Sequence, residues 1–226
     1  MCRSTGLPPS TAHRILGDVK RAGWLETGAA GSYRVGTRLW ELASRSSSAE
    51  SLAAAAIPFM SDVHTVLRQH VHVGVVEGHD VLFAERIAAS GSTVPLRSNV
   101  AGRLPLRRSA TGLALLSQCP PRTVAQYHRA AATPDAAGGP AALTVTAERF
   151  AADLAVFAQR GYAIQRERID HGTGGVAVPL RAPAGHRAVA LGTVLPLEEM
   201  RDADVPAIMQ TLRVAGHGIS RALGAL

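Results

Sequence analysis

Polar and basic side chains fall on one face of a helix expected near the start of the chain. Pro8 and Pro9 end any preceding helix, Ser10 is a good N-cap for a new one, and Gly23 would end it. The apolar residues recur at i, i+3, i+4 and i+7 and are Ala12, Ile15, Leu16 and Val19. The opposite face carries Ser10, His13, Arg14, Gly17 and Arg21. Such donors in the first turns of a recognition helix contact base edges and phosphates in a major groove. The alternative is an ordinary amphipathic helix with a solvated face.

A two-stranded hairpin expected after this helix favours DNA binding. Residues 24–27 and 33–35 read as short strands around a glycine-containing loop at 28–32. A helix followed by such a hairpin is typical of the winged helix-turn-helix. Residues 1–48 also carry seven basic residues against three acidic ones, and a net positive charge suits phosphate contact. We predict that the DNA contacts come from Ser10, Thr11, His13, Arg14, Arg21, Tyr33 and Arg34.

Two other groups of residues have chemistry of their own. His70 and His72 share one face of an expected strand, but no third metal ligand is suggested nearby. The glycine-rich run 172–175 lacks the spacing and the following Lys-Ser/Thr of a Walker phosphate loop, so a flexible loop over a pocket is favoured. Asp170 and His171 are adjacent in the sequence, and adjacent side chains on a strand point apart, so their adjacency does not indicate a catalytic dyad. With no catalytic constellation in sight, we predict no enzyme, no metal and no cofactor.

The composition is that of a globular protein with a polyanionic partner. The chain has 226 residues, 46% of them hydrophobic, and a formal net charge of +7. Its two cysteines are too few for a disulfide framework. No signal peptide and no apolar run of transmembrane length appears in the sequence, so we predict a cytoplasmic protein that does not bind a membrane.

The periodicity of the chain predicts an α+β protein with two domains. A serine-rich stretch at 44–48 is the most linker-like segment, so we place a head domain with its linker helix at 1–48 and a second domain at 49–226. In the second domain we expect strands at 70–76, 80–86, 94–97, 176–179 and 188–194, with a hairpin at Gly78-His79 between the first two. We expect helices at 50–69, 109–116, 121–131 and 203–222, the second of them capped by Ser109. A further helix is expected from its N-cap Thr146 to its C-cap Gly161, and a surface loop at 134–142.

Five motifs in order resemble the IclR family of bacterial transcriptional regulators. They are residues 6–14, Tyr33-Arg34-Val35-Gly36, residues 104–112, Arg160-Gly161-Tyr162-Ala163 and residues 172–179. The resemblance covers nearly the whole chain. It implies a winged helix-turn-helix head, a linker helix and a GAF-like effector-binding domain with a central antiparallel sheet. It also implies homodimers or tetramers on palindromic double-stranded operators and a small-molecule effector, often a carboxylate or an aromatic metabolite.

The resemblance also implies a set of effector-binding positions. Carried over residue by residue, these are Leu96, Ala110, Thr111, Gln165, Gly175, Gly192 and Val194. The sequence departs from the family pattern where Gln165-Arg166 replaces an acidic residue, Leu113 a lysine and Arg107 a histidine. We therefore expect a different ligand from that of the better-known members, or loss of ligand binding. Arg107, Arg108 and Arg166 at or beside the pocket favour an anionic effector, unless they point to solvent.

The leading hypothesis is a sequence-specific DNA-binding regulator controlled by a small molecule. The alternatives are a truncated ligand-binding and dimerisation protein with little DNA binding of its own, and an enzyme on a GAF-like scaffold. Only five residues precede Gly6, about one turn of helix, whereas the family has a first helix before its Gly-Leu-Pro motif. The sequence thus predicts a head whose first helix is missing, because the true start lies upstream or because another chain completes it. We favour the upstream start.

Overall fold

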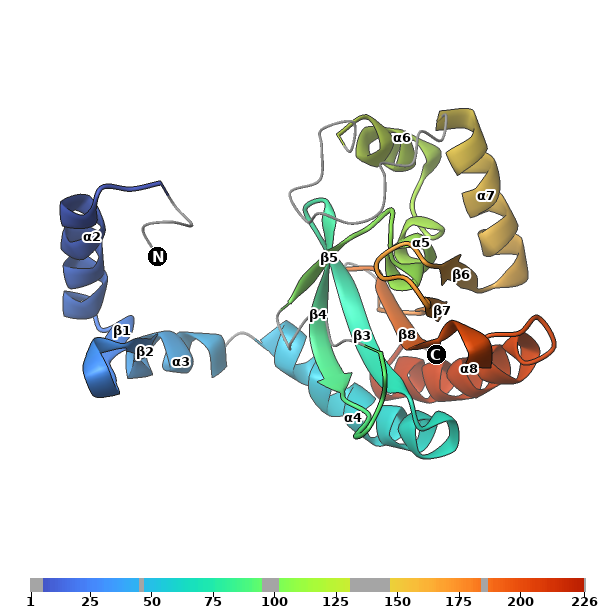
Figure 1. The fold of residues 1–226 in the computed structure, drawn as a ribbon, viewed down its shortest axis with the longest axis horizontal. Helices are drawn as coiled ribbons and strands as arrows, with labels where there is room; N and C mark the ends of the chain where they lie inside the picture. Colours follow the sequence, from blue (N-terminus) through green and yellow to red (C-terminus); the bar gives the residue numbers. More distant parts are fainter. Residues whose placement is uncertain (1–5, 45–46, 95–101, 131–146, 184–186, 226) are drawn as a thin grey trace. The chain divides into compact units, whose positions relative to one another are not determined.

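The chain forms two compact units, residues 1–50 and 51–226. The structure is a computed structural model and describes residues 6–44, 47–94, 102–130, 147–183 and 187–225. Within these ranges, no helix combines the length and the apolar character needed to cross a membrane. Figure 1 shows the elements of each unit in chain order.

The first unit is a helix followed by a hairpin and a second helix. Helix α2 (Pro9–Arg21) leads into β1 (Leu25–Thr27), the short 3-10 helix η1 (Ala29–Gly31), β2 (Tyr33–Val35) and α3 (Thr37–Ser44). The strands pair antiparallel, with Glu26 opposite Arg34. The N-cap of α2 is Pro8, and not Ser10 as predicted, because Pro9 fits the first helical position, where no N–H is needed.

The apolar stripe of α2 faces the rest of this unit. Ala12 is buried, while Ile15, Leu16 and Val19 are half-buried. Ser10, His13, Arg14 and Arg21 are exposed, as a helix with one covered face requires.

The second unit is built on a six-stranded antiparallel sheet. Its order is β5-β4-β3-β8-β7-β6. The strands are β3 (His70–Glu77), β4 (Asp80–Ile87), β5 (Arg103–Pro105), β6 (Ala163–Arg166), β7 (Thr173–Leu180) and β8 (Val189–Pro196). Helices α4 (Ser47–Leu67), α5 (Ala110–Leu116), α6 (Pro121–Ala130), α7 (Ala147–Arg160) and α8 (Val205–Ala222) surround it, and the 3-10 helix η2 (Leu197–Glu199) follows β8.

Strand alternation sorts the sheet residues into two cores. Val71 and Val73 of β3 join one core with α4 and α8 on one face of the sheet. The other face packs against α5, α6 and α7 (Figure 1), and its core includes Phe83 of β4. His70 and His72 alternate with the two valines, so both histidines belong to the second face, where the candidate site lies.

Several sequence predictions agree with these elements, and others need correction. The hairpin of β3 and β4 and the N-cap Ser109, which accepts a hydrogen bond from Gly112 N–H, are as predicted. Residues 173–175 are not a loop, because they pair with β8 and form the start of β7; Gly172 lies in the turn before them. The third strand predicted at 94–97 is not observed at Val94, and 95–97 lie outside the described residues; the third strand is β5. The loop at 134–142 and the cap Thr146 also lie outside them.

Candidate functional site

A cavity of about 60 Å³ lies between the sheet and the start of α5. Its apolar wall comes from β4, β5 and α5, with Phe83, Leu104 and Ala110, and from Val94. Charged and polar groups complete the lining: His72, Arg86, Arg108, Ser109, Thr111, Gln165, Glu167, Arg168, Asp170, Thr173 and Thr193. Ile169, Gly174, Gly175 and Val194 also contribute. A largely apolar hollow with a few convergent polar groups is typical of a small-molecule site.

A β-bulge brings Arg86 to this cavity. Val73 pairs with Glu85 and the next residue, Gly74, pairs with Phe83, so Ala84 is the extra residue of β4. An extra residue shifts the alternation of a strand by one position. Phe83 and Arg86 therefore lie on the same face, and Arg86 is the cross-strand partner of His72.

His72 and Thr111 form a buried polar pair at the cavity. Their Nε2 and Oγ1 atoms lie 2.6 Å apart, and the imidazole packs edge-on against Phe83, with 4.8 Å between ring centroids. Burial, followed by the charge of the nearby Arg86 guanidinium, lowers the pKa of His72 to about 3, so the imidazole is neutral at physiological pH. A β-carbon at Gly192 would lie 2.6 Å from Thr111 Oγ1 and 2.8 Å from His72 Nε2, so the pair needs glycine there.

Arginine side chains supply the positive charge of the lining. Burial lowers the pKa of Arg86 to about 10, which still leaves it charged at neutral pH, and its guanidinium lies 5.5 Å from the centroid of the Phe83 ring. Arg108 donates two hydrogen bonds, from Nε and Nη2, to the carbonyl oxygen of Arg168 at 3.0 and 2.6 Å. These bonds orient Arg108 at the rim between α5 and the segment that follows β6.

The cavity collects most of the residues that the resemblance assigned to effector binding. Ala110, Thr111, Gln165, Gly175 and Val194 line it. Gly192 does not line it but lies behind the His72–Thr111 pair, and Leu96 lies outside the described residues. Their role in effector binding stays a prediction.

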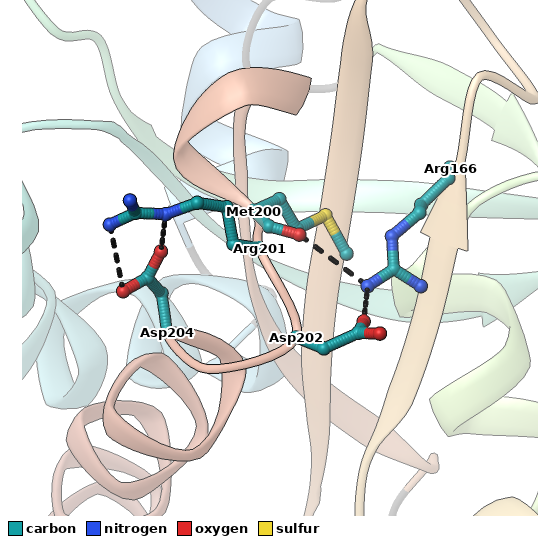
Figure 2. A network of polar contacts seen from close by, with 5 residues as sticks. All are labelled: Arg166, Met200, Arg201, Asp202 and Asp204. Atoms are coloured by element: carbon teal, nitrogen blue, oxygen red, sulfur yellow. Dashed lines mark hydrogen bonds and ion pairs between the residues drawn. The ribbon is translucent and has the colours of Figure 1, made fainter.

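Two of the three arginines expected at the pocket do not line it. Arg166 instead donates to Asp202 Oδ1 at 2.6 Å and to the carbonyl oxygen of Met200 at 3.4 Å, as Figure 2 shows. Arg107 places its guanidinium 4.8 Å from the centroid of the Phe150 ring. Both side chains are engaged by α7 or by the turn before α8, and Arg108 alone of the three reaches the cavity.

Sequence reasoning missed His72 and Arg86 as lining residues. The spacing of His70 and His72 suggested at most a metal site, and the part of the chain that the structure describes holds no cluster of three metal-ligating side chains. His70 has a structural role, since its Nδ1 accepts from Ala89 N–H at 2.9 Å and its Nε2 lies 3.2 Å from the Val94 carbonyl oxygen. The bulge that turns Arg86 inward has no sequence signal.

The predicted DNA-contacting face of the first unit has its own ion pairs. Asp18 pairs with both Arg14, at 3.7 Å, and Arg21. On the hairpin, Arg34 pairs with Glu26 at 2.9 Å. These arginines are all more than two-thirds exposed, so their guanidinium groups are accessible to a phosphate or a base edge. Tyr33 is also exposed and Thr11 is half-buried.

Comparison with known proteins supplies the family. The family model for the C-terminal part of the bacterial transcriptional regulator IclR matches residues 45–221. The chain belongs to the IclR family. The transcriptional regulator XynR of Escherichia coli is 25% identical over 224 residues, which cover 97% of this chain and 86% of XynR.

Solved structures of IclR homologues match the whole chain. One from Microbacterium hydrocarbonoxydans, complexed with 4-hydroxybenzoate, is 37% identical with a TM-score of 0.82, covering 100% of this chain and 90% of that one. Another, from Microbacterium sp. strain HM58-2, is 34% identical with a TM-score of 0.66, covering 100% and 88%. The mixed α+β fold with its antiparallel sheet is therefore the fold of this family.

Proposed function

We propose that this chain is a sequence-specific DNA-binding regulator whose effector is a small aromatic carboxylate bound in the cavity next to α5. The first unit is the winged helix-turn-helix head, with α2 as recognition helix and the β1–β2 hairpin as wing. The second unit is the GAF-like effector domain. The observation that carries the proposal is the cavity itself, with its apolar wall and its arginines, in a chain of a transcriptional regulator family.

The lining favours an aromatic anion. Phe83, Val94 and Leu104 offer an apolar surface to a ring, while Arg86 and Arg108 offer positive charge to a carboxylate. Arginine–carboxylate hydrogen bonds are strong in a partly desolvated site. The similar protein from Microbacterium hydrocarbonoxydans was solved with 4-hydroxybenzoate, a molecule of this class.

The first unit supports the DNA-binding part of the proposal. Its helix presents Ser10, His13 and Arg14 on the exposed face, at the end that a recognition helix directs to base edges. The wing presents Tyr33 and Arg34. We expect a homodimer or tetramer on a palindromic operator, since two-fold protein symmetry matches two half-sites about one helical turn or a multiple apart.

Two measurements on the full chain test the proposal. In the first, fluorescence anisotropy compares the DNA upstream of the chain's own gene with a scrambled fragment, with and without 4-hydroxybenzoate. We expect preference for the upstream fragment and a change in affinity on adding the ligand. In the second, a thermal-shift panel compares benzoate, 4-hydroxybenzoate and 4-methylphenol. Stabilisation by neutral compounds alone, or equal affinity for the two fragments, contradicts the corresponding half of the proposal.

A further inference from the structure

The hydroxyl groups around the cavity differ in how they are used. Thr173 donates to the carbonyl oxygen of Asp170 at 2.9 Å, and Thr193 donates to that of His70 at 2.8 Å. Ser109 accepts from Gly112 N–H at 3.0 Å and donates to the Pro105 carbonyl oxygen at 3.4 Å. The hydroxyl of Thr111 instead contacts His72 Nε2, a nitrogen that donates or accepts according to its tautomer.

The surroundings of His72 decide that tautomer. Its Nδ1 is buried and has no hydrogen-bond partner among the described residues. A buried N–H without a partner is rarer in proteins than an acceptor with an unused lone pair. The proton therefore belongs on Nε2, which donates to Thr111 Oγ1, and Nδ1 keeps its lone pair. Thr111 accepts from His72, and its own proton remains available for another acceptor.

Arg86 lines the same cavity as this hydroxyl. It is the cross-strand partner of His72, and both side chains contact the same ring, with the Arg86 guanidinium 5.5 Å from the centroid of Phe83 and the imidazole edge-on against it. His72, Arg86 and Thr111 all line the cavity. A hydroxyl donor and a guanidinium that line one cavity can both serve a carboxylate ligand.

We propose that the hydroxyl of Thr111, oriented by His72, donates a hydrogen bond to the effector carboxylate in the cavity that Arg86 also lines. His72 is a positioning residue, because it acts on the ligand through Thr111. The inference rests on the proposed function, since it assigns one end of the proposed aromatic carboxylate. The absence of a side chain at Gly192 fits the inference, because a β-carbon there would press on both atoms of the pair.

The tautomer is measured on the ligand-free protein. Long-range ¹H–¹⁵N spectra of the histidine side chains, with His72 assigned by comparison with His72→Gln, distinguish the two nitrogens. We expect the proton of His72 on Nε2. A proton on Nδ1 overturns the inference, because the Thr111 hydroxyl would then donate its proton to His72 Nε2 and could not donate it to the effector. This result does not depend on any effector.

Isothermal titration calorimetry on the full chain measures the contact with the carboxylate. The probes are 4-hydroxybenzoate and 4-methylphenol, whose methyl group replaces the carboxylate and accepts no hydrogen bond. A hydrogen bond to a charged group is worth enough that Thr111→Val should weaken 4-hydroxybenzoate binding about tenfold. The affinity of Thr111→Val for 4-methylphenol should stay within about twofold of wild type. The control is Thr211→Val, at a threonine of α8 that donates to the Ala207 carbonyl oxygen. This control should bind both probes within about twofold of wild type.

Variants of His72 separate positioning from packing. Glutamine keeps an N–H donor near the place of Nε2, so His72→Gln should lose less affinity for 4-hydroxybenzoate than His72→Leu does. His72→Leu combined with Thr111→Val should lose no more than Thr111→Val alone, as expected for residues that act as one unit. Additive losses, or equal losses for both probes, overturn the inference. If the wild-type protein binds neither probe, both this inference and the proposed effector class are wrong. If Thr111→Val binds 4-hydroxybenzoate as tightly as wild type, only this inference is wrong.

Discussion

Glu26 and Arg34 face each other across the β1–β2 hairpin, and their Oε2 and Nη2 atoms are 2.9 Å apart. The second carboxylate oxygen accepts from Thr37, at 3.1 Å from its N–H and 2.9 Å from its hydroxyl. These hydrogen bonds from Thr37, followed by the one from Arg34, lower the pKa of Glu26. One carboxylate thus joins the hairpin to the start of α3 and holds Arg34 on the exposed side of the wing.

The first prediction concerns Arg34 as a phosphate contact. An exposed ion pair is worth little, so Arg34 can exchange Glu26 for a DNA phosphate at low cost. Arg34→Ala should weaken binding to all DNA sequences alike and reduce the slope of log affinity against log salt by about one. Anisotropy titrations at several salt concentrations measure both, with Arg213→Ala on α8 as the control for loss of one exposed arginine. A loss confined to the operator would assign Arg34 to base reading instead.

The second prediction concerns Arg14 as a base contact. Arg14 is 72% exposed on α2 and shares Asp18 with Arg21. If Arg14 contacts a base edge, Arg14→Ala should cost about 1–3 kcal/mol on the operator and relax the preference at one base pair. Competition against a set of single-base operator variants measures that preference. An unchanged preference would show that α2 is not the recognition helix.

The helices, hairpins and caps of this chain can be predicted from the sequence where short-range rules determine them. Alternation and the turn at Gly78 predict the β3–β4 hairpin, Ser109 is a good cap for α5, and Gly161, with a φ of +75°, ends α7. The same rules fail at 172–175, where glycine suggests a loop. Residues 173–175 form a strand because β8 pairs with all three of them and β6 pairs with Gly174 and Gly175.

The sequence predicts the candidate site less well, because contacts between residues far apart in the chain place its side chains. Arg166 follows the Gly-Tyr motif and was expected at the pocket, but Asp202, 36 residues later, pairs with it elsewhere. Arg86 enters the cavity only through the bulge at Ala84. His72 meets Thr111 across 39 residues of sequence. Resemblance to a family found Thr111 and Gly175, but not these neighbours.

The third prediction concerns pH. The pKa of His72 is about 3 in the folded chain, whereas the unfolded chain takes up this proton near pH 6.5. Below pH 6.5 the unfolded state therefore binds a proton that the folded state does not, so stability falls with falling pH, by at most about 1.4 kcal/mol per pH unit. The stability is fully present above pH 6.5, and the loss continues down to about pH 3.

Urea denaturation between pH 7.5 and 5 tests this, because most carboxylates stay ionised in that window. Wild type should lose more stability than His72→Gln, whose side chain does not titrate. The pKa of His70 is also lowered, chiefly by burial, but this residue is present in both proteins and cancels in the difference. Parallel loss of stability in the two proteins would mean that His72 is protonated in the folded state.

The last prediction concerns Gly192, which has no room for a side chain. An added β-carbon would lie 2.6 Å from Thr111 Oγ1, 2.8 Å from His72 Nε2 and 3.2 Å from the β-carbon of Ala177. Backbone and buried ring cannot move far here, so Gly192→Ala should destabilise the second unit by about 1–3 kcal/mol. Because the methyl group would separate His72 from Thr111, the variant should also bind 4-hydroxybenzoate less tightly.

Gly17→Ala is the control, since its methyl group meets no atom within 4 Å. Urea denaturation gives the stability and calorimetry the affinity. A Gly192→Ala protein with wild-type stability and affinity would show that the pair tolerates a neighbour and is not held in one geometry.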